Sequence, residues 1–565
     1  MAVTITDTRT LVDHADAVGT WTSPVAGETL NLFTTDPNPV EPTGSLGMAV
    51  STQTSDILFP ISAVDLSDVL IYVWVLANGT MDTEANGGIA MVLLDATPDE
   101  IGYHLAGSDI AAFRHSDGPV GWQCLLLDTA IKIVTPGNFT NLAGLEANLD
   151  FTNITGIGAM YKTLSKALGG ASNCFTDTIR YGNNGIIIGG GTTGARGTFA
   201  EMAADDRSET NAKAWGIIRE LGAGVFGVQG PLTFGHTGAT AAHWFQDTNV
   251  VVAFEDRNIG TARYFFDVVA NTTDVGHFQL GLISGTEGGS DGCTIIIPAG
   301  IGGDIDMSDP DMDFIGLYAS VFNGFDGGVL FSDDATNGIT HDVFACDFIL
   351  CGTINPGRVD MKNCAIINSA AASAMLLEDS DNTLIASLDF QSDGTGHAIE
   401  LTHVGAGPHA ITLKGHKYTG YATIDGSTGD EVVLYNPGTL SADITITVSE
   451  SGDTPTIMKA AGVTGTVTVV NNKTVTFTGM RDNSEVRVYR ASDGVEIAGI
   501  ENVSVGPPDD KSFAWTAAAG LTVDYVIHNW LAGVPVYETI RVNDFDVPND
   551  DTSIGIQQRL DRNAV

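Results

Sequence analysis

Five short apolar runs decide the fold: CTIIIP (Cys293–Pro298), FIGLY (Phe314–Tyr318), GVLF (Gly328–Phe331), VFACDFIL (Val343–Leu350) and NCAIIN (Asn363–Asn368). Their starts lie about 12 to 21 residues apart, and Asp, Asn, Gly and Ser fill the gaps. Short strands that recur at this period are typical of a solenoid, in which each rung buries its apolar side against its neighbours. Runs that are apolar throughout indicate strands facing a buried interior. We therefore expect a right-handed parallel β-helix over residues 236–440, and a large antiparallel sandwich remains the alternative.

The segments on either side of this region also predict strands. Residues 1–150 contain β-rich runs such as LIYVWVLA (Leu70–Ala77), separated by turn residues, and predict a lectin-like β-sandwich. Residues 151–235 predict a mixed α/β connecting segment with helical candidates at Met160–Gly170 and within Thr198–Leu221. Residues 441–565 alternate apolar and polar side chains and predict one or two small C-terminal β-sandwiches. The predicted class is thus all-β and multi-domain.

The charge of the chain excludes several functions. The 565 residues carry a formal net charge of −44, with 25 Lys and Arg against 69 Asp and Glu. A surface this negative repels phosphate backbones and anionic membranes, so we expect no nucleic-acid partner. The first residues, MAVTITDTRT, lack the basic and apolar regions of a signal peptide. The longest apolar runs are too short to span a bilayer, so no membrane insertion is expected.

The six cysteines form no C-x-x-C pair, and four of them lie in or beside apolar strand-like runs. Buried reduced thiols are the favoured interpretation, with disulfides as the alternative.

Metal and sugar sites have only weak candidates. Five carboxylates, which could bind Ca²⁺ through alternating oxygens on one strand edge, lie within GGDIDMSDPDMDF: Asp304, Asp306, Asp309, Asp311 and Asp313. No EF-hand register is present, and a solvated solenoid turn is the favoured interpretation. His397, His403, His409 and His416 recur every six or seven residues, as a metal ladder or as ordinary rung-edge residues. Trp74 and Trp122 could stack on sugars, but both lie in apolar runs, so core packing is the favoured interpretation.

Catalytic motifs are absent from the sequence. There is no G-x-S-x-G elbow and no H-E-x-x-H pattern. A glycosidase needs two carboxylates at a set separation, and the sequence cannot single out a pair among 69 acids. We therefore expect no enzyme, no catalytic residue and no cofactor other than the Ca²⁺ considered above.

Both ends of the chain resemble structural proteins of tailed bacteriophages. The segment from Tyr418-Thr-Gly-Tyr through Asp425-Gly-Ser-Thr-Gly and Tyr435-Asn-Pro-Gly to the ITITVS run looks like a last β-helical rung followed by a small β-domain. The segment VTFTGMRDNSEVRVYRASDGVEIAGIENV is similar to fibronectin- or carboxypeptidase-regulatory-like domains of the same proteins. The block from YVWVLANGTM to GPVGWQC looks like their lectin-like front end.

This resemblance implies a virion appendage of the tail fibre, tailspike or head fibre class. It further implies a homotrimer, contacts with other virion proteins, and attachment to a glycan of the host surface. The expected location is the virion, assembled in the host cytoplasm. A polysaccharide-degrading tailspike and a bacterial surface adhesin are the alternative functions.

Overall fold

The computed structural model is almost entirely β, which confirms the predicted all-β class. Among the residues that the structure describes, the helices are α1 (Phe199–Asp205) and a short 3₁₀ turn, η5 (Phe151–Asn153). The chain divides into two compact units, Met1–Gly357 and Arg358–Val565. The structure describes residues 4–7, 10–13, 15, 17–22, 30–33, 45–48, 54–77, 89–96, 100–104, 123–129, 149–162, 174–182, 186–189, 198–205, 218–228, 230–235, 243–246, 249–254, 258–259, 264–269, 276–283, 290–298, 302–309, 312–331, 341–378, 385–426, 428–450, 452–504, 506, 510–531, 534–548 and 550–560.

Two sheets face each other in the N-terminal part of the first unit. One sheet has the order β5 (Thr54–Val64), β10 (Ile154–Lys162), β7 (Ile89–Asp95), β8 (Glu100–His104). The other has the order β18 (Asn258–Ile259), β9 (Gln123–Asp128), β6 (Leu70–Ala77), β11 (Cys174–Gly182), β4 (Ser45–Met48), β3 (Leu30–Phe33), and β2 (Thr10–Asp13) also pairs with β11. Apart from the short β18–β9 pair, all these strands pair antiparallel.

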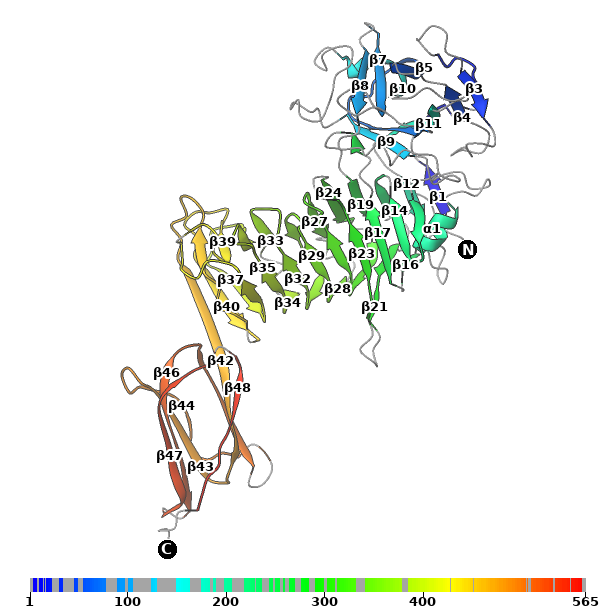
Figure 1. Ribbon diagram of the computed structural model, residues 1–565. Helices are drawn as coiled ribbons and strands as arrows, with labels where there is room; N and C mark the ends of the chain where they lie inside the picture. The colour runs from blue at the N-terminus through cyan, green and yellow to red at the C-terminus, as the bar shows by residue number, and fades with distance from the viewer. Residues whose placement is uncertain are drawn as a thin grey trace. The chain divides into compact units, whose positions relative to one another are not determined.

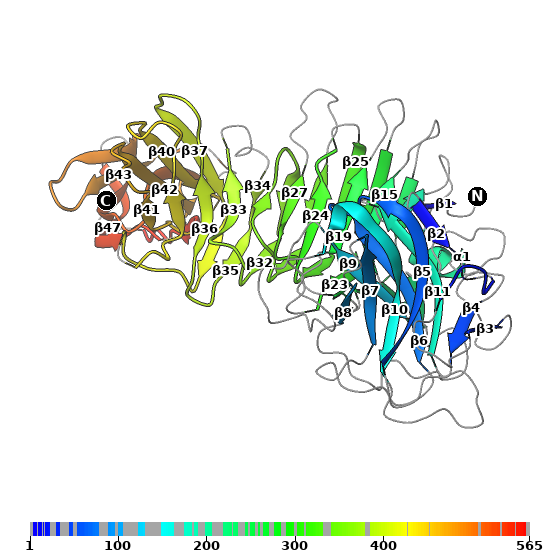
Figure 2. The ribbon, with the colours of Figure 1, turned by 90° about the horizontal axis from the view of Figure 1, so that it is seen from above.

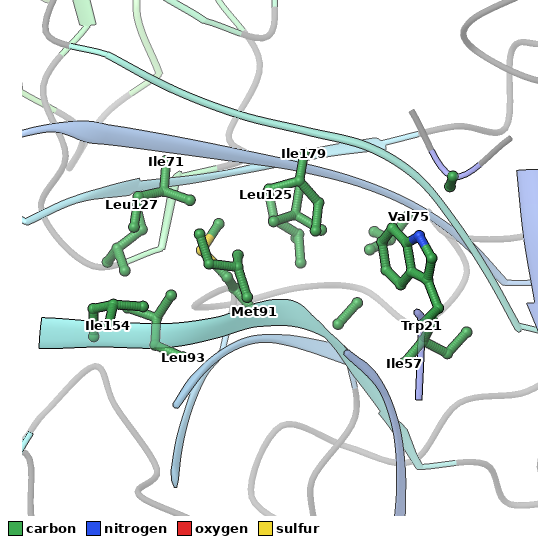
Figure 3. Packing of buried hydrophobic residues seen from close by; sticks show 14 of the residues in the cluster. Trp21, Ile57, Ile71, Val75, Met91, Leu93, Leu125, Leu127, Ile154 and Ile179 are labelled. Carbon is green, nitrogen blue, oxygen red and sulfur yellow. The ribbon is translucent and has the colours of Figure 1, made fainter. Parts of the chain in front are cut away.

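Both sheets of this sandwich contribute apolar side chains to the core between them. Figure 3 shows Ile71, Leu125 and Ile179 facing Met91 and Leu93 across the gap between the sheets. These side chains are fully buried, and they alternate with residues on the opposite face of each strand, as the period of two requires. Burying them supplies the main free energy that holds the two sheets together.

Strands β10 and β11 come from the segment expected to be a mixed connector. Each lies inside one sheet of the N-terminal sandwich and pairs with strands on both sides. The helix predicted from Met160 is wrong at its start, because Met160–Lys162 end β10; residues 163–170 lie outside the described residues. The second helical candidate contains α1, which is followed by β13 (Ile218–Gly222).

The rest of the first unit is a stack of parallel rungs (Figures 1 and 2). The chain visits three sheets in turn, here named A, E and F. Sheet A contains β12 (Ile186–Gly189), β15 (Leu232–Gly235), β19 (Tyr264–Val269), β24 (Gly303–Met307), β27 (Gly328–Phe331) and β30 (Ile354–Asn355). Sheet E contains β16 (His243–Gln246), β20 (Gly276–Leu280), β25 (Met312–Tyr318) and β28 (Asp342–Phe344). Sheet F contains β14 (Val225–Val228), β17 (Val250–Phe254), β23 (Cys293–Ile296), β26 (Val321–Asn323) and β29 (Asp347–Ile349).

The second unit begins with further rungs of the same kind. Its sheet A strands are β33 (Ser373–Leu377), β36 (His397–Leu401), β39 (Val433–Tyr435) and β41 (Ile457–Lys459). Its sheet E strands are β31 (Asp360–Lys362), β34 (Ile385–Ala386), β37 (His409–Lys414), β40 (Ile444–Ser449) and β42 (Val467–Met480), and its sheet F strands are β32 (Ala365–Ile367), β35 (Asp389–Gln391) and β38 (Lys417–Thr419).

Neighbouring rung strands pair parallel within each unit. This pairing rules out the antiparallel sandwich that the sequence left open for residues 236–440. Aromatic rings stack between rungs inside sheet F: Phe322 on Phe348 at 5.4 Å and Phe390 on Tyr418 at 5.7 Å between ring centroids. Each rung therefore shares its interior with the next, as expected of a solenoid.

The corner between sheets E and F repeats from rung to rung. Ala319 and Ala345 in the first unit, and Asn363 and Ser387 in the second, have φ between 47° and 56°. This left-handed conformation turns the chain within two residues. The N–H of Ala319 donates to the Phe344 carbonyl, and that of Ser387 to the Lys414 carbonyl. The corners are therefore hydrogen-bonded between rungs, like the strands that they connect.

Two antiparallel strands and the helix α1 cover the first rungs of the stack. β1 (Thr4–Asp7) pairs antiparallel with β12, and β13 pairs antiparallel with β14, so two of the three sheets begin with an antiparallel strand. Phe199 of α1 is fully buried, and its ring lies 5.4 Å from Trp244 and 6.0 Å from Phe234. Such coverage protects strand edges and the open interior from pairing with another chain.

The C-terminal sandwich is joined to the rungs by one continuous strand. The first part of β42 pairs parallel with β40, and its second part, from Asn472, pairs antiparallel with β45 (Lys511–Ala518) and parallel with β48 (Thr552–Gly555) (Figure 1). The facing sheet has the order β44 (Glu496–Ile500), β43 (Ser484–Arg490), β46 (Thr522–Leu531), β47 (Val534–Asp546). The buried Lys473 side chain donates to the Gly452 carbonyl at 2.7 Å, which ties the strand to the preceding loop.

Candidate functional site

The carboxylates considered for Ca²⁺ are spread over different elements. Asp304 and Asp306 alternate with the buried Ile305 and Met307 on β24. The Asp306 carboxylate accepts hydrogen bonds from the N–H and the hydroxyl of Ser308, at 2.9 Å and 2.5 Å. The Asp306 carboxylate therefore holds the chain at Ser308, directly after β24.

The remaining acidic candidates do not extend this group. Asp309 follows β24 in the chain. Asp313 lies near the start of β25, which belongs to a different sheet, and its side chain is outside the described residues. Asp311 also lies outside the described residues. Within the ranges that the structure describes, no three His, Cys, Asp or Glu side chains are arranged to hold a metal ion.

The four recurring histidines do not form a ladder. The rings of His403 and His409 pack edge to face at 5.0 Å, whereas His397 Nδ1 lies 2.6 Å from the Glu431 carbonyl. His416 is buried, and its Nδ1 accepts the N–H of Leu388 at 3.2 Å. His403 and His409 therefore pack against each other, whereas His397 and His416 make hydrogen bonds to neighbouring rungs.

The tryptophans considered for sugar binding do not present an accessible ring in the described part of the chain. Trp74 is 2% exposed and lies on β6, opposite Cys124 of β9. Its indole is therefore packed in the interior, as the favoured interpretation held. Trp122 lies outside the described residues. All six cysteines are buried, and none of them forms a disulfide, which confirms the favoured interpretation of the thiols.

An outward-facing group that the sequence analysis did not single out lies on sheet E of the first unit. On β25 and β28, Ile315, Leu317 and Val343 are fully buried and point into the rungs. Because side chains alternate along a strand, the residues between them point outward. These are Phe314, Gly316, Tyr318, Asp342 and Phe344, and the three aromatic rings with the Asp342 carboxylate are called the aromatic face below.

Gly316 allows the two rings of β25 to lie close to the backbone. A Cβ atom on Gly316 would meet a Phe314 ring carbon at 2.6 Å and a Tyr318 ring carbon at 2.8 Å. Any side chain at this position would push the rings apart. The pattern Phe-x-Gly-x-Tyr is therefore the sequence signal for this group, because all three residues fall on one face of a strand.

The next rung completes the aromatic face. Gly316 is in register with Asp342, and Tyr318 with Phe344. The Tyr318 hydroxyl donates to Asp342 Oδ2 at 3.3 Å. Partial burial, followed by the charge of Asp342, raises the pKa of Tyr318 to about 12, so the phenol keeps its proton at neutral pH. The group combines flat apolar rings with a carboxylate and a phenol held in a fixed arrangement.

Comparisons with known proteins give no family for this chain. No protein-family model and no curated protein matches it. A solved structure described as "Structural analysis of an exo-beta-agarase" matches with a TM-score of 0.21 and 11% sequence identity. That match covers 31% of this chain and 24% of the agarase chain, so it spans less than a third of either protein and carries no functional argument. None of the described helices is long and apolar enough to cross a membrane.

Proposed function

We propose that this protein is a structural appendage of a tailed-phage virion that attaches to glycans of the host surface. The observation that carries the proposal is the stack of parallel rungs, each hydrogen-bonded to the next in three sheets. A stack of this kind buries one continuous core and gives a stiff scaffold. We further propose that it winds as a right-handed parallel β-helix, the hand favoured for parallel crossover connections.

Binding rather than catalysis is the proposed work of this scaffold. The aromatic face offers contact surface and hydrogen-bonding groups, and it contains one carboxylate, Asp342, where glycoside hydrolysis uses a pair. A homotrimer with other virion proteins as neighbours is part of the same proposal, based on the resemblance of the two chain ends to phage proteins.

Location in the particle tests the proposal. Purified virions of the phage that encodes this chain would be analysed by quantitative mass spectrometry and by gold labelling with an antibody against residues 467–560. We expect the protein in the particles, at a multiple of three copies per attachment site. Absence from the particles would overturn the virion role.

Activity is tested on the same preparation. We expect no new reducing ends and no unsaturated sugars when the protein is incubated with host capsule or lipopolysaccharide. Release of either product would replace the adhesive role with that of a depolymerase.

A further inference from the structure

We propose that the aromatic face of Phe314, Tyr318, Phe344 and Asp342 binds uncharged hexopyranose units of a polysaccharide. This inference rests on the proposed adhesive function and gives it a site and a class of ligand.

The rings lie on outward positions of sheet E, and the same sheet elsewhere carries polar side chains at such positions. In the second unit, the outward positions of β37 and β40 include Thr412, Lys414, Thr447 and Ser449. Phe314, Tyr318 and Phe344 are only partly buried, in contrast with Phe322 and Phe348, which stack inside the rungs and are fully buried. Partly exposed aromatic rings that gather on neighbouring strands mark a surface used for contact.

The chemistry of the group matches a sugar ring. A hexopyranose has apolar C–H faces and hydroxyls at its edge, so it suits an aromatic plane bordered by hydrogen-bonding groups. The Asp342 carboxylate is a strong acceptor for sugar hydroxyls. The Tyr318 hydroxyl, whose proton is donated to Asp342, can accept a further hydrogen bond from the sugar. The 3.3 Å contact between Tyr318 and Asp342 fixes these two polar groups relative to each other before any ligand arrives.

The charge of the molecule selects among sugars. With a net charge of −44 and a carboxylate within the site itself, the protein repels uronic acids, sialic acid and sulfated sugars. An uncharged polysaccharide meets no such repulsion. The same argument makes salt concentration a weak variable for binding, because few charges meet across the contact.

The competing explanation is that Phe314 and Tyr318 only shield the backbone at Gly316, as aromatic side chains do beside glycines in sheets. That explanation requires the rings but not the phenol, and it makes no use of Phe344. Tyr318→Phe keeps the covering ring and removes the hydroxyl, so it separates the two explanations. Phe344→Thr places on β28 the kind of residue that the outward positions of β37 and β40 carry, and Thr suits a strand.

The test is affinity electrophoresis of the full-length chain in native gels cast with one polysaccharide each: dextran, galactomannan and agarose as uncharged probes, and alginate as the anionic control. We expect at least one uncharged polysaccharide to retard the wild-type protein, and alginate not to retard it. Phe344→Thr is expected to weaken the apparent affinity at least tenfold, and Tyr318→Phe and Asp342→Asn about three- to tenfold. Tyr489→Ala removes an outward aromatic ring from β43 and should leave the affinity unchanged.

Folding of every variant is checked by circular dichroism and by its thermal midpoint. Retardation of the wild type by none of the uncharged probes overturns the inference, as does equal retardation of wild type and folded Phe344→Thr. If virions carry the protein and bind host glycan equally well with either version, this site is wrong while the adhesive function stands. If the protein is absent from virions but the gels behave as expected, the proposed virion role is wrong and the binding site stands.

Discussion

Ala345 illustrates how single residues shape the rungs. Its φ of 55° lies in the left-handed region, where a Cβ atom crowds the following carbonyl, at a cost of roughly 1–2 kcal/mol. Gly281 and Gly415, which directly follow the sheet E strands β20 and β37, lie in the same left-handed region, with φ of 80° and 67°. The stack therefore accepts a strained alanine at a corner where glycine would also serve.

Replacing Ala345 with glycine is expected to stabilise the protein. Glycine relieves the left-handed strain but gains freedom in the unfolded chain, so the net gain should be about 0.5–1 kcal/mol. The matched control is Ala365→Gly in the extended β32, which should destabilise by a similar amount. Urea unfolding followed by intrinsic fluorescence measures both changes; a loss of stability in Ala345→Gly would contradict the account of the corner.

His416 makes a second prediction at this scale, because it is a buried imidazole at the corner before β38. Burial lowers the pKa of His416 to about 4, below the ordinary value of 6.5, so the folded protein holds the ring neutral with Nδ1 accepting the Leu388 N–H. A folded pKa below the unfolded one gives stability that is complete above pH 6.5. That stability is lost as the pH falls from 6.5 toward 4.

The contribution of His416 to this loss should be about 3 kcal/mol between pH 7 and pH 4. Urea midpoints of wild type and His416→Leu, measured across this range, check the value. We expect the variant to be less stable at pH 7, because the Leu388 N–H loses its acceptor, and to have a flatter pH dependence. An unchanged slope in the variant would show that other groups cause the acid sensitivity.

At the scale of the element, the rungs pack backbone against backbone. Gly465, in the turn before β42, donates its N–H to the Leu440 carbonyl of the preceding rung. A Cβ atom on Gly465 would lie 1.8 Å from the Ala442 carbonyl oxygen and 2.6 Å from its carbon. The contact is with backbone, so no side-chain rotation can relieve it.

Gly465→Ala is therefore expected to destabilise the second unit by about 1–3 kcal/mol, through overpacking. Gly555→Ala is the control, since nothing lies within 4 Å of its Cβ position on β48. Differential scanning calorimetry compares the two variants with the wild type. Equal midpoints for Gly465→Ala and Gly555→Ala would mean that the turn before β42 is looser than the structure has it.

At the scale of the whole molecule, the net negative charge governs how strongly copies of the chain repel one another in solution. The net charge of −44 keeps chains apart at low salt and is screened at physiological ionic strength. The proposed homotrimer must overcome this repulsion, so its stability should rise with salt.

Sedimentation equilibrium of the full-length protein tests this expectation. The chain mass is 59.0 kDa, and we expect a species of three times that mass at 150 mM NaCl, with partial dissociation at 10 mM. Circular dichroism at both salt concentrations controls for unfolding. A monomer at micromolar concentration under both conditions would remove the trimer from the proposal.

Local pattern was enough to predict the class and the kind of rung. The evenly spaced apolar runs from Cys293 to Asn368 predicted stacked parallel strands, because such short strands can bury their apolar side only against copies of themselves. The buried free cysteines also followed from their apolar surroundings. The net charge of −44 alone led to the expectation of no nucleic-acid partner, and this stays a prediction.

Long-range pairing decided the rest. FIGLY reads as apolar throughout, yet the register of β25 between β20 and β28 turns Phe314 and Tyr318 outward and Ile315 and Leu317 inward. The apolar run around Trp74 favoured a buried indole, which the structure confirms, but the sequence could not place β10 in the N-terminal sandwich, because its partner β7 is distant along the chain. A period of two gives the alternation of side chains but not which alternate set is buried; only the partners on each side of a strand make that choice.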